Sequence, residues 1–322
     1  MKKTAVVLFN LGGPDSLDSV QPFLENLFND PDIFRLPFQK TLARYISVKR
    51  APKVIKEYEL IGGKSPINEW TEKQRSMLEN QLRSAGYNSD VFVAMRYWKP
   101  LTQDVIPKIE NGNYDRIILL PLYPHFSIST TGSSFNEWKR FYKGDYSKLI
   151  YINSYQTHPV YLKAINQRID ETLLLFPENV RDEVQLVFSA HGTPVSYLKK
   201  GDPYSFQIKE TIDAVMKLRN YSHKHHLCYQ SKVGPAKWLE PATDKMIEDL
   251  AALGKKHLLI IPISFVSDHI ETSFELDIEY RHVADKVKIE NYFVMKGLND
   301  SHLFIDALFD LVKEKINGAE IK

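Results

Sequence analysis

The residues best suited to chemistry in this sequence are a histidine and a row of acids, each following an apolar run. His191 comes three residues after the run Gln185–Phe188, and the Gly192 and Pro194 beyond it are typical of a tight turn. An imidazole held at the end of a strand can accept a proton near neutral pH or bind a metal ion. A lone histidine is also commonly structural, so this pattern leaves both roles open.

The acidic residues Asp268, Glu271, Glu275 and Glu279 are spaced to share one face of a helix. Such a helix would begin near Ser267 or Asp268, because both residue types cap helix N-termini well. A row of like charges repels itself, and a solvated surface is its ordinary explanation. This row follows a predicted strand, however, so it also fits a site where carboxylates and an imidazole bind a divalent cation such as Fe²⁺ and accept protons.

Three other features carry less weight. His269 is either a site residue or part of the helix start, and the sequence does not distinguish these. The stretch Leu11-Gly-Gly-Pro14 lacks the glycine spacing and the following acid of a dinucleotide site. Residues Ser129–Ser134 are expected to cap a helix, with phosphate or carboxylate binding as the alternative.

Short apolar runs between turn residues predict strands, and amphipathic stretches between those runs predict helices. The expected strands are Thr4–Phe9, Asp90–Met95, Arg116–Leu120, Gln185–Phe188, His226–Gln230 and His257–Ile261. The expected helices are Ile67–Ala85, Tyr161–Phe176, Pro203–Leu218 and Thr243–Leu253. Their alternation predicts βαβ units and therefore an α/β fold with mostly parallel sheets.

The two halves of the chain repeat the same landmarks. Pro100 opens a helical stretch and Pro121 interrupts an apolar strand 21 residues later, and Pro241 and Pro262 repeat this pattern at the same 21-residue spacing. We infer two similar domains, each a parallel sheet flanked by helices. We expect a cleft between them at the carboxyl ends of the strands, where such sheets bind ligands.

The first half also carries an insertion. Pro14 to Pro100 is 86 residues but Pro194 to Pro241 is only 47, which leaves 39 extra residues in the first half. We place them at about 30–64, a basic stretch rich in apolar residues. It fits either a solvated helical hairpin or a lip that covers a ligand or rests on an anionic membrane. The expected domains are 1–150 and 151–302, followed by a C-terminal helix at 303–322 that can pack back on the first domain.

The bulk composition is that of a folded globular protein. The 322 residues are 43% hydrophobic and 25% charged, with a net charge of +2, which argues against a dedicated nucleic-acid binder. The single cysteine, Cys228, excludes an internal disulfide or a cysteine-rich metal cluster. The apolar stretch Ala5–Phe9 is too short for a signal peptide, and no run approaches a membrane span. We expect a soluble, cytoplasmic protein that is at most peripheral to a membrane.

Together these motifs resemble the ferrochelatase family. The blocks that carry the likeness follow the family order and are Asn10–Asp15, Ile61–Pro66, Met95–Tyr97, Ser129–Ser134, Phe188–His191, Gly201–Tyr204, Gln230–Pro235, Ser267–Thr272 and Glu275–Tyr280. Each block is moderately specific, and the ordered set is very specific. The resemblance implies two Rossmann-like, chelatase-type domains that hold a porphyrin, with Fe²⁺ as a substrate that is inserted to form haem as two protons leave.

The resemblance also implies roles for individual residues. His191 would lie over the macrocycle, accept pyrrole protons and contact the metal, with Glu271 opposite as its partner. Glu275, Asp268 and Glu279 would extend the acidic row for metal delivery or proton removal. The implied porphyrin contacts are Leu11, Arg50, Arg96, Tyr97, Tyr123 and Ser127, and the lip would be residues 33–50.

The sequence departs from the family pattern at three places. Leu11 stands where the coproporphyrin-using branch tends to have tyrosine, which favours protoporphyrin IX as substrate. Gly192-Thr-Pro194 replaces the Ser-Leu-Pro of many relatives, so the local backbone can differ. The sequence ends at Lys322 without the cysteine-bearing extension of some members, so no [2Fe–2S] cluster is expected. The alternatives are a coproporphyrin ferrochelatase, another tetrapyrrole chelatase and a non-catalytic carrier of tetrapyrrole or metal.

Overall fold

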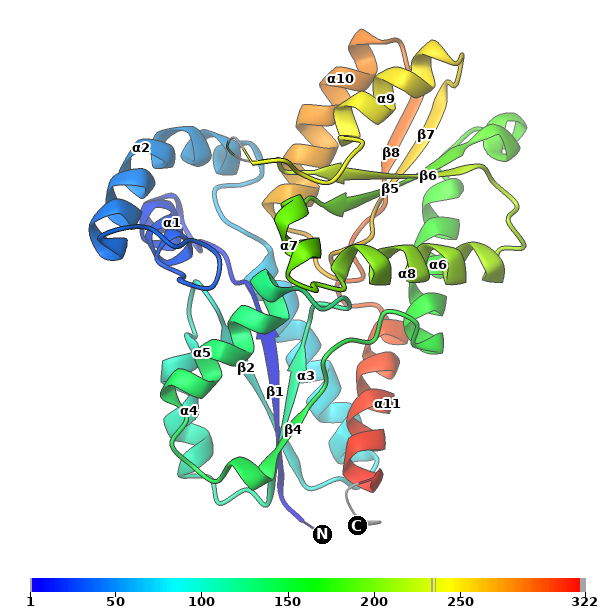
Figure 1. Cartoon of the computed structure of the whole chain (residues 1–322). Helices are drawn as coiled ribbons and strands as arrows, with labels where there is room; N and C mark the ends of the chain where they lie inside the picture. The colour runs from blue at the N-terminus through cyan, green and yellow to red at the C-terminus, as the bar shows by residue number, and fades with distance from the viewer. Residues whose placement is uncertain (1, 233, 235, 319–322) are drawn as a thin grey trace. The chain divides into compact units, whose positions relative to one another are not determined.

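The computed structural model describes residues 2–232, 234 and 236–318, and its contacts divide the chain into two units (Figure 1). Unit 1 is Met1–Tyr155 together with Asp300–Lys322, and unit 2 is Gln156–Asn299. The last helix, α11 (His302–Gly318), belongs to unit 1, where it packs against α3 (Ile67–Ser84). Residues 319–322, the end of the helix expected at 303–322, lie outside the described residues, as do Val233 and Pro235 of one family block.

Unit 1 is built on a parallel sheet of four strands in the order β2-β1-β3-β4. The strands are β1 (Thr4–Asn10), β2 (Ser89–Met95), β3 (Arg116–Pro121) and β4 (Leu149–Tyr151). Every residue of β1 and β3 is buried, as expected for central strands covered by helices on both faces. Besides α3 and α11, the helices are η1 (Leu17–Ser19), α1 (Val20–Phe28), α2 (Gln39–Leu60), α4 (Thr102–Glu110), η2 (Ile128–Gly132), α5 (Ser133–Phe141) and η3 (Tyr146–Lys148).

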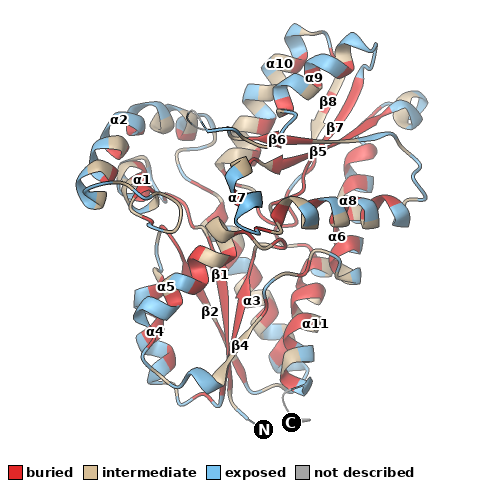
Figure 2. Ribbon diagram, viewed as in Figure 1, coloured by how far each residue is buried: buried red, intermediate tan, exposed pale blue. Residues whose placement is uncertain are grey.

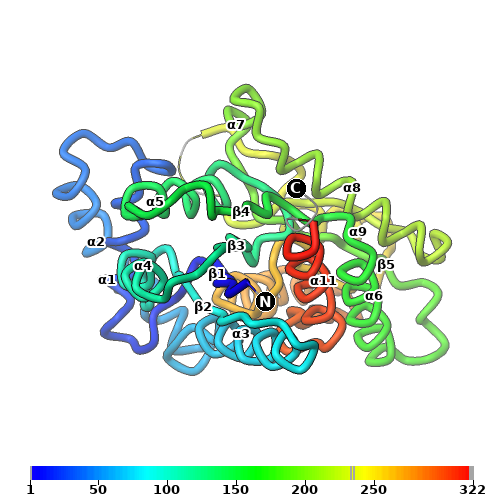
Figure 3. Tube along the Cα trace, turned by 90° about the horizontal axis from the view of Figure 1, so that it is seen from below, coloured from blue at the N-terminus to red at the C-terminus, as the bar shows by residue number. Residues whose placement is uncertain are grey.

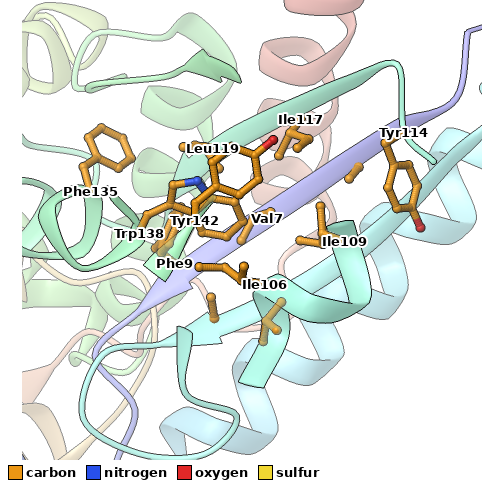
Figure 4. Packing of buried hydrophobic residues seen from close by; sticks show 13 residues of the cluster. Val7, Phe9, Ile106, Ile109, Tyr114, Ile117, Leu119, Phe135, Trp138 and Tyr142 are labelled. Carbon is orange, nitrogen blue, oxygen red and sulfur yellow. The ribbon is translucent and has the colours of Figure 1, made fainter. Parts of the chain in front are cut away.

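The sheet of unit 1 lies between two helical layers, α4 and α5 on one face and α3 and α11 on the other (Figure 3). On the α4–α5 face, Phe9 makes edge contacts with Phe135 and Trp138, and each ring pair has its centroids 5.8 Å apart (Figure 4). Trp138 in turn stacks on Tyr142. Burying an aromatic side chain stabilises a fold by roughly 1.5–3 kcal/mol. This cluster therefore fixes the carboxyl end of β1, from which Asn10 and Leu11 emerge.

Unit 2 repeats this architecture with strands in the order β6-β5-β7-β8, all parallel. The strands are β5 (Gln185–His191), β6 (His225–Gln230), β7 (His257–Pro262) and β8 (Asn291–Val294). The helices are α6 (Pro159–Leu173), η4 (Glu178–Glu183), α7 (Val195–Lys199), α8 (Tyr204–Leu218), α9 (Thr243–Ala252), η5 (Glu271–Glu279) and α10 (Tyr280–Lys286). The central strands β5 and β7 are buried almost throughout (Figure 2).

The identical strand order in the two units confirms the predicted α/β fold with two similar domains. The matched landmarks also have matched structures, because α4 begins at Thr102 and α9 at Thr243, two residues after the paired prolines. All six expected strands form. The sequence did not predict β4 and β8, because both are edge strands of only three and four residues with mostly partly exposed side chains.

The insertion expected at about 30–64 contains one long helix, α2, rather than a helical hairpin of its own. Its buried residues include Ala43, Ser47 and Ala51, which are four positions apart and share one side of the helix. Small side chains there allow close packing against α1, the main partner of α2. Across the described residues, we find no helix with the length and apolar character needed to cross a membrane.

Candidate active site

His191 is the last residue of β5, and hydrogen bonds fix its backbone on both sides. Its N–H donates to Ser264 Oγ at 2.9 Å, and Tyr204 Oη donates to its carbonyl oxygen at 3.0 Å. Ser264 follows β7, which pairs directly with β5, so the sheet itself brings these residues together. The side chain of His191 is 36% exposed, which leaves the imidazole accessible at the carboxyl edge of the sheet.

Glu271, the first residue of η5, contacts His191 directly. Its Oε2 is 3.1 Å from Nδ1 of His191 and 3.3 Å from Nε2 of His269. His269 is buried, and its Nδ1 is 3.0 Å from the carbonyl oxygen of Ser267. Phe265 contacts both imidazoles, with ring centroids 6.0 Å from His191 and 4.3 Å from His269. One carboxylate oxygen therefore holds two imidazoles, and His269, which sequence reasoning left undecided, supports the site from the interior.

This arrangement shifts the protonation equilibria of both partners. Burial lowers the pKa of His191, but the charge of Glu271, their hydrogen bond and the charge of Glu275 outweigh it, so the pKa lies above that of a free histidine. Burial raises the pKa of Glu271, and the contacts with His191 and His269 more than reverse this, so its pKa lies well below the usual glutamate range. An ionised Glu271 only accepts hydrogen bonds. Nδ1 of His191 therefore carries a hydrogen, and Nε2 of the neutral ring offers a lone pair to a ligand.

The pair differs from the expectation in one respect. The resemblance implied that Glu271 lies opposite His191 across a macrocycle, but a separation of 3.1 Å leaves no space for a ring system between them. The reason is topological, because β5 and β7 are neighbours and the chain after β7 turns back toward the end of β5. The two groups therefore lie next to each other at the carboxyl edge of this sheet.

Glu275 lies one helical turn beyond Glu271, and its carboxylate binds the chain that follows β6. Its Oε1 accepts from the N–H of Ser231 at 2.7 Å and from Tyr280 Oη at 2.9 Å, and its Oε2 accepts from Ser231 Oγ and from Gln230 Nε2. Burial and the charge of Glu271 raise the pKa of Glu275, against the effect of the Ser231 and Tyr280 hydrogen bonds. Glu275 therefore links η5 to β6 and binds a proton more readily than an exposed glutamate does.

The two ends of the acidic row have other surroundings. Asp268 precedes the helix and accepts from the N–H of Gly297 at 2.9 Å, from Asn299 Nδ2 at 2.6 Å and from Thr272 Oγ1 at 3.2 Å. Glu279 is exposed. The four acids are thus not equivalent, and Glu271 is the one in contact with His191.

The helix that carries the row is a π-helix over Glu271–Glu279, not the α-helix with a start near Ser267 that its spacing suggested. Helices of this type are rare and are frequent at functional sites. Its wider turn still places Glu271 and Glu275 on one side, since the first meets the end of β5 and the second the end of β6.

The residues expected to contact porphyrin all lie in unit 1, and three of them meet where β1 and β2 end. The N–H of Arg96 donates to the carbonyl of Asn10 at 2.9 Å, and the N–H of Tyr97 donates to that of Leu11 at 3.0 Å. The side chain of Arg96 is only 8% exposed and Tyr97 is 1% exposed. Both side chains bind the buried Asp30. Both side chains therefore belong to an interior hydrogen-bond network, and neither the guanidinium of Arg96 nor the phenol of Tyr97 projects from the surface.

Tyr123, Ser127 and Arg50 complete that set. Burial raises the pKa of Tyr123 far above its usual value. Ser127 is buried, and its Oγ accepts from the N–H of Ser129 at 3.3 Å, so it caps η2 two residues before the stretch in which the sequence predicted a cap. Arg50 is separate, on α2, where its guanidinium lies over the ring of Phe28 at 5.7 Å.

Sequence reasoning assigned no role to the residues that hold the site: Tyr204, Gln230, Ser231, Ser264 and Tyr280. Membership of the family blocks was a signal for all of them except Ser264. Nothing local in the sequence indicates that Ser264, which follows β7, binds the backbone of His191 at the end of the neighbouring strand β5. Across the described residues, no three histidine, cysteine or acidic side chains form a ready-made metal cage.

Comparisons with known proteins identify the family of this chain. The family model described as Ferrochelatase matches residues 3–316. The ferrochelatase of Geotalea uraniireducens is 48% identical and covers 98% of this chain and 99% of its own, and that of Trichodesmium erythraeum is 44% identical, with 99% of this chain and 84% of its own length covered. Among solved structures, SirB from Bacillus subtilis with Fe³⁺ has a TM-score of 0.54 at 12% identity, with 99% and 98% of the two chains covered, a likeness of fold. The chain belongs to the ferrochelatase family.

Proposed function

We propose that this protein inserts Fe²⁺ into protoporphyrin IX, forms haem b and releases two protons. Family membership supports the reaction class. The observation that carries the mechanism is the contact between His191 and Glu271 at the carboxyl edge of the unit 2 sheet.

The chemical task is to exchange two pyrrole N–H protons for one metal ion. In a flat macrocycle these hydrogens lie in the ring plane, where a base reaches them poorly. A site that favours a bent macrocycle exposes them, and this uses binding energy toward the transition state. Nε2 of His191 then accepts a proton while Glu271 keeps the hydrogen bond to Nδ1 and stabilises the imidazolium that forms.

The remaining acids have graded roles in this proposal. Glu275 has a raised pKa and lies on the same helix as Glu271, so it can accept a proton after His191. Asp268 is committed to three donors and holds the chain that leads into η5. Fe²⁺ is a substrate here, and the metal contacts that we propose are His191 and Glu271.

The choice of porphyrin rests on Leu11, which follows β1 beside Tyr97. An apolar side chain at this position suits the vinyl-bearing edge of protoporphyrin, whereas the coproporphyrin-using branch tends to have a tyrosine there. A Leu11→Tyr variant should shift the ratio of kcat/KM for the two porphyrins toward coproporphyrin. An unchanged ratio would remove the argument for protoporphyrin.

The deciding experiment is a visible-absorption assay of purified protein with Fe²⁺ kept reduced and the two porphyrins offered in parallel. Multiple turnovers with protoporphyrin and slower ones with coproporphyrin are expected. The reverse ratio would identify a coproporphyrin ferrochelatase. Stoichiometric binding without insertion would identify a carrier, and competition with Co²⁺ in the same assay tests whether another metal is preferred.

We also propose that the lip, residues 33–50, contacts an anionic membrane surface. Phe38, Tyr45 and Val48 are 86%, 54% and 49% exposed and are interspersed with lysines and arginines, a combination suited to a charged interface. The protein should sediment with phosphatidylglycerol vesicles more than with phosphatidylcholine vesicles, and a Phe38→Ser, Tyr45→Ser double variant should lose this difference. Equal sedimentation of all samples would contradict the proposal.

A further inference from the structure

One buried carboxylate marks the start of the insertion in unit 1. The side chain of Asp30 is 0% exposed, and its oxygens accept hydrogen bonds from four groups. Oδ1 accepts from Nη2 of Arg96 at 3.0 Å and from the N–H of Asp32 at 2.9 Å, and Oδ2 accepts from Tyr97 Oη at 2.7 Å and from Ser133 Oγ. An ionised carboxylate has about four acceptor positions, so this one is saturated.

The four donors come from three different parts of unit 1. Asp32 lies in the insertion itself, Arg96 and Tyr97 follow β2, and Ser133 begins α5. The carbonyl of Asp30 also accepts from the N–H of Phe34 at 2.8 Å, which fixes the first turn of the insertion. A single residue thus joins the root of the insertion to segments 67 and 103 positions further along the chain.

Arg96 is fully engaged by the same network. Its Nε donates to Ser133 Oγ at 2.8 Å, its Nη2 faces Asp30, and its Nη1 lies 3.4 Å from Glu137 Oε1. Each nitrogen of the guanidinium therefore has a protein oxygen as its neighbour. The geometry makes Arg96 a support for Asp30 rather than a cation offered to a ligand.

The other end of the insertion is built differently. Gly62 and Gly63 have φ values of +96° and +82°, a conformation that favours glycine, and no atom lies within contact distance of a side chain added at Gly62. Between the two ends, α2 packs mainly on α1. The start of the insertion is thus held by a buried ion pair and side-chain hydrogen bonds, whereas its glycine end is held by backbone hydrogen bonds from Gly63 to Tyr58 and from Ser65 to Pro14. The Asp30 contacts can therefore be removed by a single side-chain substitution.

We propose that Asp30 is a positioning residue that sets the place of the lip, residues 33–50, and through it the binding of porphyrin. The link to porphyrin rests on the proposed function and on the porphyrin contact that the resemblance implies for Arg50 of the lip, but the tie between Asp30 and the lip does not. Asp30 acts through Arg96, Tyr97 and Ser133, and we assign it no contact with the reacting atoms.

The test is Asp30→Asn, which keeps the size of the side chain but removes its charge and replaces one acceptor oxygen with a donor. KM for porphyrin should rise by about tenfold while kcat and KM for Fe²⁺ stay within about twofold. Amide hydrogen exchange in 33–60 should accelerate while exchange in α3 does not change. A structural defect without a positioning role would instead accelerate exchange throughout unit 1.

Two further variants keep the test decisive. Asp145→Asn is a matched change on an exposed acid of the same unit outside the insertion, which accepts from the N–H of Ser147, and it should leave KM for porphyrin near the wild-type value. Ser133→Ala removes one donor and keeps the ion pair, so it serves with the same measurements if Asp30→Asn does not fold. Unchanged lip exchange in the Asp30 and Ser133 variants would overturn the proposal. If the wild type inserts no iron, the proposed function is wrong. The hydrogen-exchange measurement still tests whether Asp30 holds the lip in place.

Discussion

The chemistry proposed for His191 depends on which form of its imidazole is present. Only the neutral ring has a lone pair on Nε2, and the pKa of His191 lies above the free value because of Glu271 and Glu275. We expect kcat/KM to rise with pH through an apparent pKa above about 6.5, the usual histidine value. Glu271→Gln removes the nearest charge, so this acid limb should move to lower pH while the plateau falls by about 10²-fold.

The control is His191→Ala, which should abolish turnover while the thermal melting curve keeps its shape. A pH profile that is identical in wild type and Glu271→Gln would show that another group controls the acid limb. Robust turnover in His191→Ala would show that the proton acceptor lies elsewhere.

Cys228 is expected to play no part in catalysis, although a thiol is a chemically reactive group. It is fully buried, it accepts a hydrogen bond from Thr243 Oγ1 at 3.3 Å, and burial raises the pKa of its thiol to about 12. Cys228→Ser keeps a donor and an acceptor at this position, so it should cost about 1 kcal/mol of unfolding free energy. Its kcat and KM should equal those of the wild type, and a loss of activity without a loss of stability would contradict this.

The position of His191 was predictable from sequence because it depends only on where a strand ends. Its contact with Glu271 was not, because 80 residues separate the two and the pairing of β5 with β7 brings them together. The burial of Arg96 and Tyr97, which the resemblance implied as porphyrin contacts, was not predictable either, because it follows from the distant Asp30 and Ser133.

At the scale of elements, the π-helix η5 is the feature that local propensity could not predict. Its acids recur at intervals compatible with an α-helix, and nothing in that spacing indicates a π-helix instead. Asp268 anchors the start through Gly297 and Asn299, and Glu275 fixes the middle through Ser231. These anchors place Glu271 against His191.

A comparison of Asp268→Ala with Glu279→Gln distinguishes two roles for the acidic row, holding η5 in place and delivering the metal ion. Loss of the Asp268 hydrogen bonds should cost about 1–3 kcal/mol and lower the melting temperature, because the N–H of Gly297 loses its partner. Its kcat should fall through displacement of Glu271, with KM for Fe²⁺ unchanged. The exposed Glu279→Gln should be silent in every measurement. A raised KM for Fe²⁺ in either variant would instead indicate that the acidic row delivers the metal.

At the scale of the whole molecule, the duplication visible in the sequence predicted two sheets of one topology, and it did so from paired prolines and matched apolar runs. It could not show that unit 1 is completed by the C-terminal helix. A helix after the last strand has no counterpart in the repeat, so its partner is decided by tertiary packing against α3.

The two cores should therefore respond separately to cavities. Leu308 on α11 and Ile247 on α9 are both fully buried, so each change to alanine should cost about 2–5 kcal/mol. In Leu308→Ala, hydrogen exchange should accelerate in unit 1, including strand β1. In Ile247→Ala, it should accelerate in unit 2. Exchange that accelerates equally in both units for either variant would mean that the chain opens as one cooperative body. In that case the two clusters of contacts do not correspond to two independent units of stability.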